Sequence, residues 1–190
     1  SQYWYQGSES PFYTDSHRAF RAKVRHFVDQ ELIPNVAEWD ETGTYKRELI
    51  HKAYKQGIYA AIYPPEFGGT PPPQFNAFHD LILLDELARC GSNGILVSAF
   101  FSIGYGLPPM LLAGFPHAGL HSKKQLENIA RNVITGRKHI ALAITEPFAG
   151  SDVAGLQATG KIILDDKTGE RFLLLNGEKK FITSGVKADY

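Results

Sequence analysis

The hydrophobic period of the chain changes near residue 137. Before that point, apolar residues recur at three- and four-residue steps, as on one face of an α-helix. After it come four short segments rich in Ile and Leu, 138–145, 160–164, 171–175 and 179–183, which are typical of β-strands. This order predicts an α+β fold, with an amino-terminal α-helical bundle domain over 1–137 and an incomplete antiparallel β-barrel-like domain over 138–190.

Boundary signals locate the helices of the first domain. They predict helices over about 15–32, 45–56, 75–89 and 122–135. Asp15 or Ser16 can cap the first helix, Gly57 ends the second, and Ser122 with Gln125 forms a capping box for the last. The helix over 75–89 is apolar almost all round, so we expect it to be central and buried.

Charge and cysteine content exclude several classes of protein. Twenty Lys and Arg balance twenty Asp and Glu, so no basic field is available to hold nucleic acid. Cys90 is the only cysteine, which excludes an internal disulfide, suits a reducing compartment and predicts a small buried apolar side chain. The segment Ser1–Tyr5 has neither the basic nor the apolar region of a secretion signal, and we expect an intracellular protein.

An uncharged run from Gly91 to Pro116 is long enough to suggest a membrane span. Four glycines and Pro108-Pro109 interrupt it, so two short buried helices with a break fit better than a span. His117 and His121 are four residues apart, but the intervening glycine and the preceding proline argue against a helical metal site. The common nucleotide-binding, P-loop, zinc-protease and serine-hydrolase motifs are absent from the sequence.

The segment Thr145–Asp152, T-E-P-F-A-G-S-D, carries the first chemical signal. It follows the apolar run His139–Ile144, and Pro147 ends that predicted strand because proline cannot donate to a ladder. Ala149, Gly150 and Ser151 then make a small-residue loop whose backbone N–H groups can converge on an anion or an electron-rich ring edge. Taken alone, the segment fits a purely structural turn equally well.

A second segment, Asn176–Gly185, reads N-G-E-K-K-F-I-T-S-G and is followed by Ala188-Asp189. Its first two residues predict a tight hairpin turn, because both tolerate positive φ. The two segments, in this order and at this separation, resemble the acyl-CoA dehydrogenase family. Pro64–Gly69 and Asp85–Ala88 are similar to the amino-terminal half of that family, so the resemblance covers nearly the whole chain from about Asp15.

The resemblance implies FAD-dependent α,β-dehydrogenation of an acyl-CoA thioester, in which a carboxylate takes the α-proton and the β-hydride passes to flavin N5. Thr145 would bond the pyrimidine side of the flavin, Gly150 and Ser151 would face the phosphates, and Ser151 would also contact the acyl-CoA. Phe181 would cover one flavin face and Thr183 would bond near N5. The implied cofactor-binding set is Leu142, Ala143, Ile144, Thr145, Gly150, Ser151, Phe181, Ile182 and Thr183.

Two of these positions depart from the family pattern, which most often has Trp where Phe181 stands and often has an aromatic residue where Leu142 stands. Glu146 and Asp152 are expected to have structural roles, since one precedes a proline and the other begins a turn. The resemblance places the catalytic base in a carboxy-terminal domain, so no catalytic residue is expected in this segment. The predicted strands are too few for a closed domain, and we expect the chain to be truncated, the amino-terminal half of the enzyme, binding FAD weakly or not at all alone.

The resemblance also implies partners: an acyl-CoA substrate, electron-transferring flavoprotein as acceptor and a homotetramer, in the cytoplasm or the mitochondrial matrix. No nucleic acid and no membrane span are expected. Two alternatives remain open. One is an acyl-CoA oxidase or nitroalkane oxidase of the same fold, and the other is a truncated non-catalytic relative that serves as an interaction module.

Overall fold

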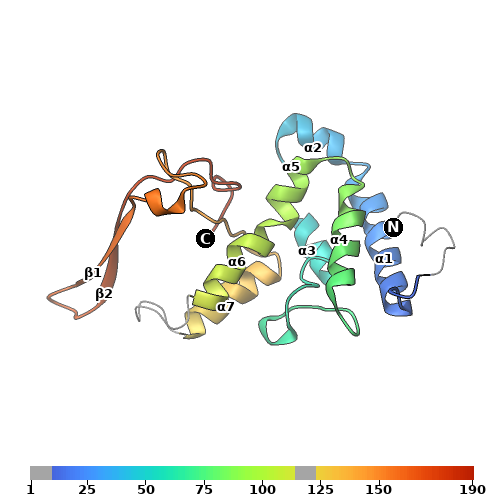
Figure 1. Cartoon of the computed structure of the whole chain (residues 1–190), viewed down its shortest axis with the longest axis horizontal. Helices are drawn as coiled ribbons and strands as arrows, with labels where there is room; N and C mark the ends of the chain where they lie inside the picture. Colours follow the sequence, from blue (N-terminus) through green and yellow to red (C-terminus); the bar gives the residue numbers. More distant parts are fainter. Residues whose placement is uncertain (1–9, 114–122) are drawn as a thin grey trace. The chain divides into compact units, whose positions relative to one another are not determined.

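The computed structural model describes residues 10–113 and 123–190, which divide into two compact units (Figure 1). Unit 1 holds 10–101 together with 134–137, and unit 2 holds 102–113, 123–133 and 138–190. The predicted division at residue 137 stays a prediction. The expected capping box of Ser122 and the pair His117 and His121 lie outside the described residues.

Unit 1 is helical throughout. In chain order it contains α1 (Asp15–Phe27), the π-helical turn η2 (Val28–Leu32), α2 (Val36–Thr42), α3 (Glu48–Lys55), the 3₁₀ turn η3 (Pro65–Phe67), α4 (Ala77–Ala88), α5 (Asn93–Ile95) and the π-helical turn η4 (Leu96–Phe100). Figure 1 shows α1 and α4 side by side, and these two helices make the largest set of contacts between helices of the unit.

The core of unit 1 forms where the apolar face of α1 meets its neighbours. Phe20, Val24 and Phe27 are buried as the period predicts, and α4 contributes Ile82 and Leu87. The amino-terminal cap of α1 is Thr14 and not Asp15 or Ser16, because Thr14 has the extended conformation that a cap requires.

The expectation that the helix over 75–89 is central and buried holds for one of its sides only. On α4 the side chains of Leu81 and Leu84 are 50% and 42% exposed, since unit 1 covers only one side of this helix. The predicted stop at Gly57 is confirmed: its φ of 67° is the left-handed conformation that ends a helix. Cys90 is buried, also as expected.

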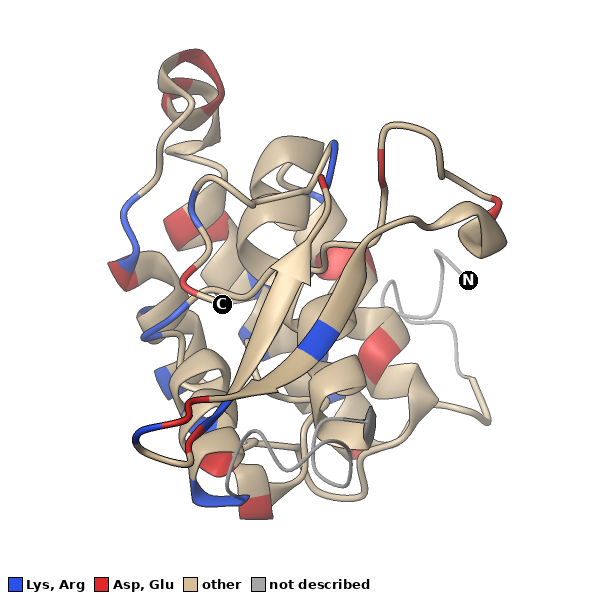
Figure 2. Cartoon of the chain, turned by 90° about the vertical axis from the view of Figure 1, so that its left-hand side faces the viewer, with Lys and Arg blue, Asp and Glu red and all other residues tan. Residues whose placement is uncertain are grey.

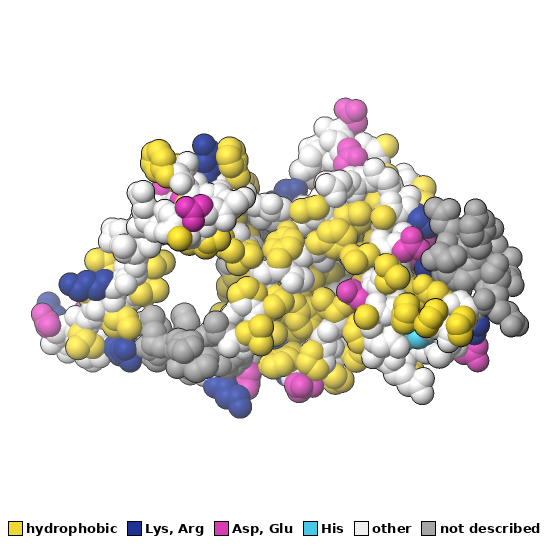
Figure 3. Space-filling view, in the orientation of Figure 1, with side chains coloured by type: hydrophobic (Ala, Val, Ile, Leu, Met, Phe, Trp, Pro, Cys, Tyr) yellow, Lys and Arg dark blue, Asp and Glu magenta, His cyan; other side chains and the backbone are white. Residues whose placement is uncertain are grey.

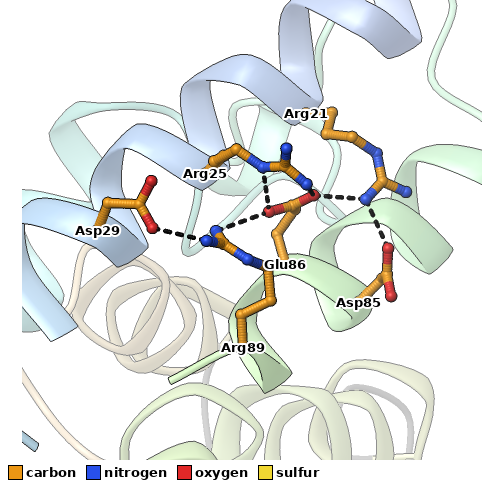
Figure 4. Close-up of polar contacts among 6 residues, drawn as sticks. All are labelled: Arg21, Arg25, Asp29, Asp85, Glu86 and Arg89. Atoms are coloured by element: carbon orange, nitrogen blue, oxygen red, sulfur yellow. Dashed lines mark hydrogen bonds and ion pairs between the residues drawn. The ribbon is translucent and has the colours of Figure 1, made fainter. Parts of the chain in front are cut away.

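A buried ion network joins α1 to α4 (Figure 4). Glu86 is fully buried and accepts hydrogen bonds from Arg21, from Arg25 (2.8 and 3.0 Å) and from Arg89 (3.1 Å). Arg21 also pairs with Asp85, and Arg89 with Asp29 at 2.8 Å. Burial raises the pKa of Glu86, but the bonds from Arg25 and Arg21 outweigh burial and hold that pKa below its usual range.

Unit 2 contains α6 (Ser102–Ala113), most of α7 (Lys123–Ile134), the 3₁₀ turn η5 (Val153–Gly155) and one antiparallel ribbon. Strand β1 (Thr159–Leu164) pairs with β2 (Arg171–Asn176) in the register Thr159↔Asn176 to Leu164↔Arg171. The sequence Asp165-Asp166-Lys167-Thr168-Gly169 predicts a turn between the two strands, and this turn is confirmed: the N–H groups of Lys167 and Thr168 donate to Asp165 Oδ1 at 2.8 Å. The α+β class is thus confirmed, with a sheet that does not close.

Two of the four predicted strands are wrong. Residues 138–145 are not in a β-ladder, and 179–183 form a bend and turn. Asn176-Gly177 makes no hairpin turn, because Asn176 ends β2 and no strand follows it in the chain. Both segments instead make isolated hydrogen bonds to distant residues. A pattern of apolar residues cannot distinguish such a buried segment from a strand in a β-ladder.

Apolar side chains remain exposed on the ribbon. Figure 2 shows the strands facing the viewer with few charged residues along them, and Figure 3 shows apolar side chains exposed along the same ribbon. The exposed apolar residues of the two strands are Ile162, Ile163, Leu164, Phe172, Leu173, Leu174 and Leu175. Because neighbours in a strand point to opposite faces, both faces of the ribbon are apolar, as in a sheet that other layers cover.

The uncharged run of the sequence folds as α5, η4 and α6. Among the described residues, Asn93–Leu112 is one helical run that by length and composition alone could cross a membrane, and a core helix passes the same test. Phe100, the last residue of η4, is buried and packs against Phe27 and Tyr59, with ring centroids 6.2 and 6.3 Å away. Phe100 is therefore a core residue of unit 1.

Candidate functional site

The two sequence motifs lie side by side in unit 2. The run before the first motif meets the end of the second where the N–H groups of Asp189 and Tyr190 donate to the carbonyl of His139 at 2.8 and 3.1 Å. Asp189 adds its carboxylate, which accepts from the His139 N–H (2.9 Å) and from Lys138 Nζ (2.8 Å). The N–H of Ala141 closes the pair by donating to the Tyr190 carbonyl at 3.0 Å. The residues at the end of the second motif therefore hold the run that leads into the first.

The centres of the two motifs are joined as closely. The N–H of Lys180 donates to the Thr145 carbonyl at 2.8 Å. The ammonium group of Lys179 donates to the Ile144 carbonyl at 2.9 Å and to Glu146 Oε1 at 2.7 Å. Residues some thirty-five positions apart in sequence thus form one site.

Glu146 is the buried carboxylate of this site, 6% exposed. Besides Lys179, it accepts from the N–H groups of Gln157 (2.6 Å) and Ala158 (3.1 Å). The bond from Lys179, followed by those from Gln157 and Ala158, holds the pKa of Glu146 below its usual range. A carboxylate so occupied is a structural anchor and a poor base, in agreement with the structural role expected for it.

The small-residue loop follows Glu146. The backbones of Glu146 and Ala149 bond each other at 3.0 and 3.2 Å, which closes a turn around Pro147 and Phe148. Gly150 has open space where a side chain would stand. Asp152 has the structural role expected for it, accepting from the Ala154 N–H at 3.2 Å to begin η5.

This loop presents hydrogen-bond donors. The N–H groups of Gly150 and Ser151 and the Ser151 hydroxyl have no partner in the part of the chain that the structure describes. Thr145 and Thr183 likewise have side-chain hydroxyls without a described partner. Free donors of this kind fit the phosphates and ring heteroatoms of a dinucleotide cofactor.

Phe181 is held in an unfavourable conformation. Its φ is 56°, a left-handed value that a bulky residue seldom adopts, and its ring is 83% exposed. The Lys180 ammonium lies 4.6 Å from the ring centroid. Strained residues concentrate at ligand sites, and an exposed ring beside a site is free to cover a planar ligand.

An open cavity of about 540 Å³ lies between the two motifs. Its walls include Ala141 and Ala143 from the run before the first motif, Lys179 and Ile182 from the second motif, and Tyr190 just after it. Two of the predicted cofactor-binding residues, Ala143 and Ile182, therefore line this cavity. The other seven, Leu142, Ile144, Thr145, Gly150, Ser151, Phe181 and Thr183, are not among its lining residues, and their assignment stays a prediction.

Three site residues were not singled out from sequence. Lys179 and Asp189 hold the motifs together, and Ser184 bonds the Tyr105 hydroxyl of α6. Burial raises the pKa of Tyr105, and the Ser184 bond opposes that rise. Lys179 and Ser184 stand inside the second segment and Asp189 follows it, but nothing in the sequence shows which distant residue each one meets.

The site offers no metal chemistry of its own. Within residues 10–113 and 123–190, no three His, Cys, Asp or Glu side chains group closely enough to hold a metal ion. Its buried carboxylate, Glu146, is already occupied by Lys179 and two backbone N–H groups. Its other described features are the loop donors without a described partner, the exposed ring of Phe181 and the open cavity.

Curated proteins similar to this chain are named as acyl-CoA dehydrogenases and related acyl-CoA enzymes. The chain is 31% identical to acyl-CoA dehydrogenase AFT10-1 of Alternaria alternata, over 98% of its own length and 43% of that protein. It is 30% identical to the caffeyl-CoA reductase–Etf complex subunit CarC of Acetobacterium woodii, over 94% of its length and 43% of that protein. The chain thus spans less than half the length of these curated relatives.

Solved structures of acyl-CoA dehydrogenases are also similar to this chain. The structure of butyryl-CoA dehydrogenase from Megasphaera elsdenii superposes with a TM-score of 0.74 at 27% identity, covering 95% of this chain and 44% of that one. Residues 14–117 match the family model described as "Acyl-CoA dehydrogenase, N-terminal domain". This match covers more than half of the chain, and the remainder aligns with the same relatives. The chain belongs to the acyl-CoA dehydrogenase family of oxidoreductases.

Proposed function

We propose that this chain is the amino-terminal half of an FAD-dependent enzyme that dehydrogenates an acyl-CoA thioester between Cα and Cβ. The contact between the two motifs carries the proposal: the Lys180 N–H meets the Thr145 carbonyl at 2.8 Å and brings the donors of both motifs to one place. The similarity to acyl-CoA dehydrogenases of known name supports the reaction class.

The chain's own residues bind and orient in this proposal. Thr145 and Thr183 donate hydroxyl hydrogen bonds to the heteroatoms of the flavin ring, and the N–H groups of Gly150 and Ser151 meet the phosphates. Phe181 covers one face of the ring, and Ser151 also contacts the acyl-CoA. When bound, FAD supplies the acceptor for the hydride that leaves Cβ.

Proton abstraction requires a base that these residues do not offer. Glu146 is paired with Lys179 and with two backbone N–H groups, and Asp152 caps η5. We therefore assign the catalytic carboxylate to the carboxy-terminal part of the natural full-length gene product. The exposed apolar faces of the β1–β2 ribbon support further chain packing on this unit.

The proposed partners follow from the family. One relative is by name a subunit of an Etf complex, which supports electron-transferring flavoprotein as the electron acceptor. We propose a homotetramer in the cytoplasm or the mitochondrial matrix. An oxidase of the same fold would instead pass its electrons to oxygen, and a non-catalytic relative would hold no flavin.

The test is the flavin content and oxygen reactivity of the natural full-length gene product. Heat-released FAD in equimolar amount, with slow reoxidation by oxygen after reduction and fast reoxidation by electron-transferring flavoprotein, is the expected result. Fast reoxidation by oxygen would transfer the assignment to an oxidase. Absence of flavin, even after incubation with excess FAD, would contradict the proposal and favour an interaction module.

A further inference from the structure

One carboxylate joins three segments of unit 2 that are far apart in the sequence. Glu146, next to the proposed flavin ligand Thr145, accepts the N–H groups of Gln157 and Ala158 just before β1. It accepts Lys179 Nζ from the second motif at 2.7 Å. Because Glu146 is buried and Lys179 is its one partner that carries a charge among the described residues, this cation has no substitute nearby.

Lys179 also orients the backbone beside Glu146. Its ammonium donates to the Ile144 carbonyl at 2.9 Å, and the next residue, Lys180, donates its N–H to the Thr145 carbonyl at 2.8 Å. The carbonyls of Ile144 and Thr145 thus both accept hydrogen bonds from the second motif. The Thr145 hydroxyl is left without a described partner, so the orientation that Lys179 fixes is the orientation in which this hydroxyl is presented.

We propose that Lys179 is a positioning residue: its two hydrogen bonds fix Ile144–Glu146 so that Thr145 can bind the flavin. The assignment rests on the proposed flavin site. Lys179 also lines the cavity between the motifs, where its side chain is about two-thirds buried. Two of its three ammonium N–H groups donate to protein acceptors, and in this proposal those two bonds carry its contribution to cofactor binding.

The variant Lys179→Met removes both hydrogen bonds and keeps a long apolar stem. It leaves the Glu146 carboxylate without its cation and the Ile144 carbonyl without its donor, so the segment can reorient. We expect the FAD dissociation constant to rise about ten- to one-hundred-fold, as for the loss of a charged hydrogen bond. Lys179→Arg can donate to both acceptors, and we expect it to recover most of the affinity.

The experiment measures FAD affinity and the visible flavin spectrum in the natural full-length gene product and its variants. Lys161→Met, on exposed β1, removes the same charge away from the site and controls for net charge. A shifted spectrum in Lys179→Met with recovery in Lys179→Arg is the expected result, because a residue that only adds stability would not alter the flavin bands. Glu146→Gln, an isosteric change, serves if Lys179→Met does not fold, and should weaken FAD binding in the same direction.

The outcomes separate this inference from the proposed function. A wild-type protein that binds FAD, with Lys179→Met unchanged in affinity and spectrum, would overturn the role of Lys179 alone. A wild-type protein that binds no FAD would overturn the proposed function and the positioning role with it. In either case, the change in the NMR shifts of the Gln157, Ala158 and Lys180 amides between wild type and Lys179→Met shows whether Lys179 orders the backbone around Glu146.

Discussion

The imidazole rings of His17 and His79 stack with their centroids 4.0 Å apart, at the first turns of α1 and α4. Each ring accepts, through Nδ1, the backbone N–H of its own helix cap: Thr14 for His17 (2.9 Å) and Asn76 for His79 (3.3 Å). Because a backbone N–H only donates, both Nδ1 atoms are unprotonated. Each Nε2–H then donates across to the other helix, to Asn76 Oδ1 (2.9 Å) and Ser16 Oγ (3.0 Å).

This reciprocal capping makes unit 1 sensitive to acid. A proton on Nδ1 would face a backbone donor at the positive end of a helix. Burial, and then the neighbouring His17, lower the pKa of His79. The unfolded chain therefore binds the proton first, and stability that is full above about pH 6.5 is lost as the pH falls toward the lowered pKa.

The pH prediction is tested with His79→Gln, because glutamine at this position still forms a capping box but does not titrate. Thermal unfolding followed by circular dichroism should show a smaller loss of midpoint temperature in His79→Gln than in wild type between about pH 7.5 and about pH 5.5. Equal losses in the two proteins would contradict the account.

Removal of the buried charge of Glu86 should be costly. Glu86→Gln leaves three arginines around a neutral amide, and we expect the free energy of unfolding of unit 1 to fall by about 3–5 kcal/mol. Asp85→Asn is the matched control on the adjacent residue, whose side chain is 56% exposed, and should cost about 1 kcal/mol or less. Urea denaturation measures both, and similar losses would show that the network is not centred on Glu86.

Acid should weaken the anchoring hydrogen bonds of the Glu146 carboxylate. The lowered pKa of Glu146 means that its stabilising charge is present above the ordinary glutamate range and is lost as the pH falls through the lowered value. The amide protons of Gln157 and Ala158 donate to this carboxylate, so their NMR shifts should titrate together, with a midpoint below that of an ordinary glutamate. In Glu146→Gln this shared titration should disappear.

The ring of Phe181 should matter for cofactor binding more than for folding. Its side chain is 83% exposed, so Phe181→Ala removes little packing, while loss of a stacking face should weaken FAD binding about three- to ten-fold. Phe181→Trp keeps a stacking face and should bind FAD at least as well as wild type. FAD dissociation constants measured by flavin fluorescence compare the three proteins. If Phe181→Ala binds FAD as tightly as wild type, the ring does not contribute to cofactor binding.

Local chemistry made part of this fold predictable. The apolar face of α1, the left-handed stop at Gly57 and the Asp165–Gly169 turn depend on neighbours in the sequence, and the structure has all three. The α+β class of the fold could be predicted from the change in hydrophobic period near residue 137 alone. The cap at Thr14 was missed because Asp15 is an equally good capping residue by type, and only the backbone conformation decides between them.

What could not be predicted depends on distant partners. Glu86 meets Arg25 across sixty-one positions, and Glu146 meets Lys179 across thirty-three. The apolar segments 138–145 and 179–183 were interpreted as strands because patterning reports burial and not ladder pairing. The order of residues in the two motifs was enough to identify them in the sequence. The hydrogen bond that joins Thr145 to Lys180 is seen only in the structure.

The central claim is that the two motifs build one flavin site for acyl-CoA oxidation. The most direct measurement is the visible absorption spectrum of the natural full-length gene product, recorded without oxygen while acyl-CoAs of increasing chain length are added. The account predicts flavin bands that bleach with at least one acyl-CoA. A protein without flavin bands, or with bands that no acyl-CoA bleaches, would contradict it.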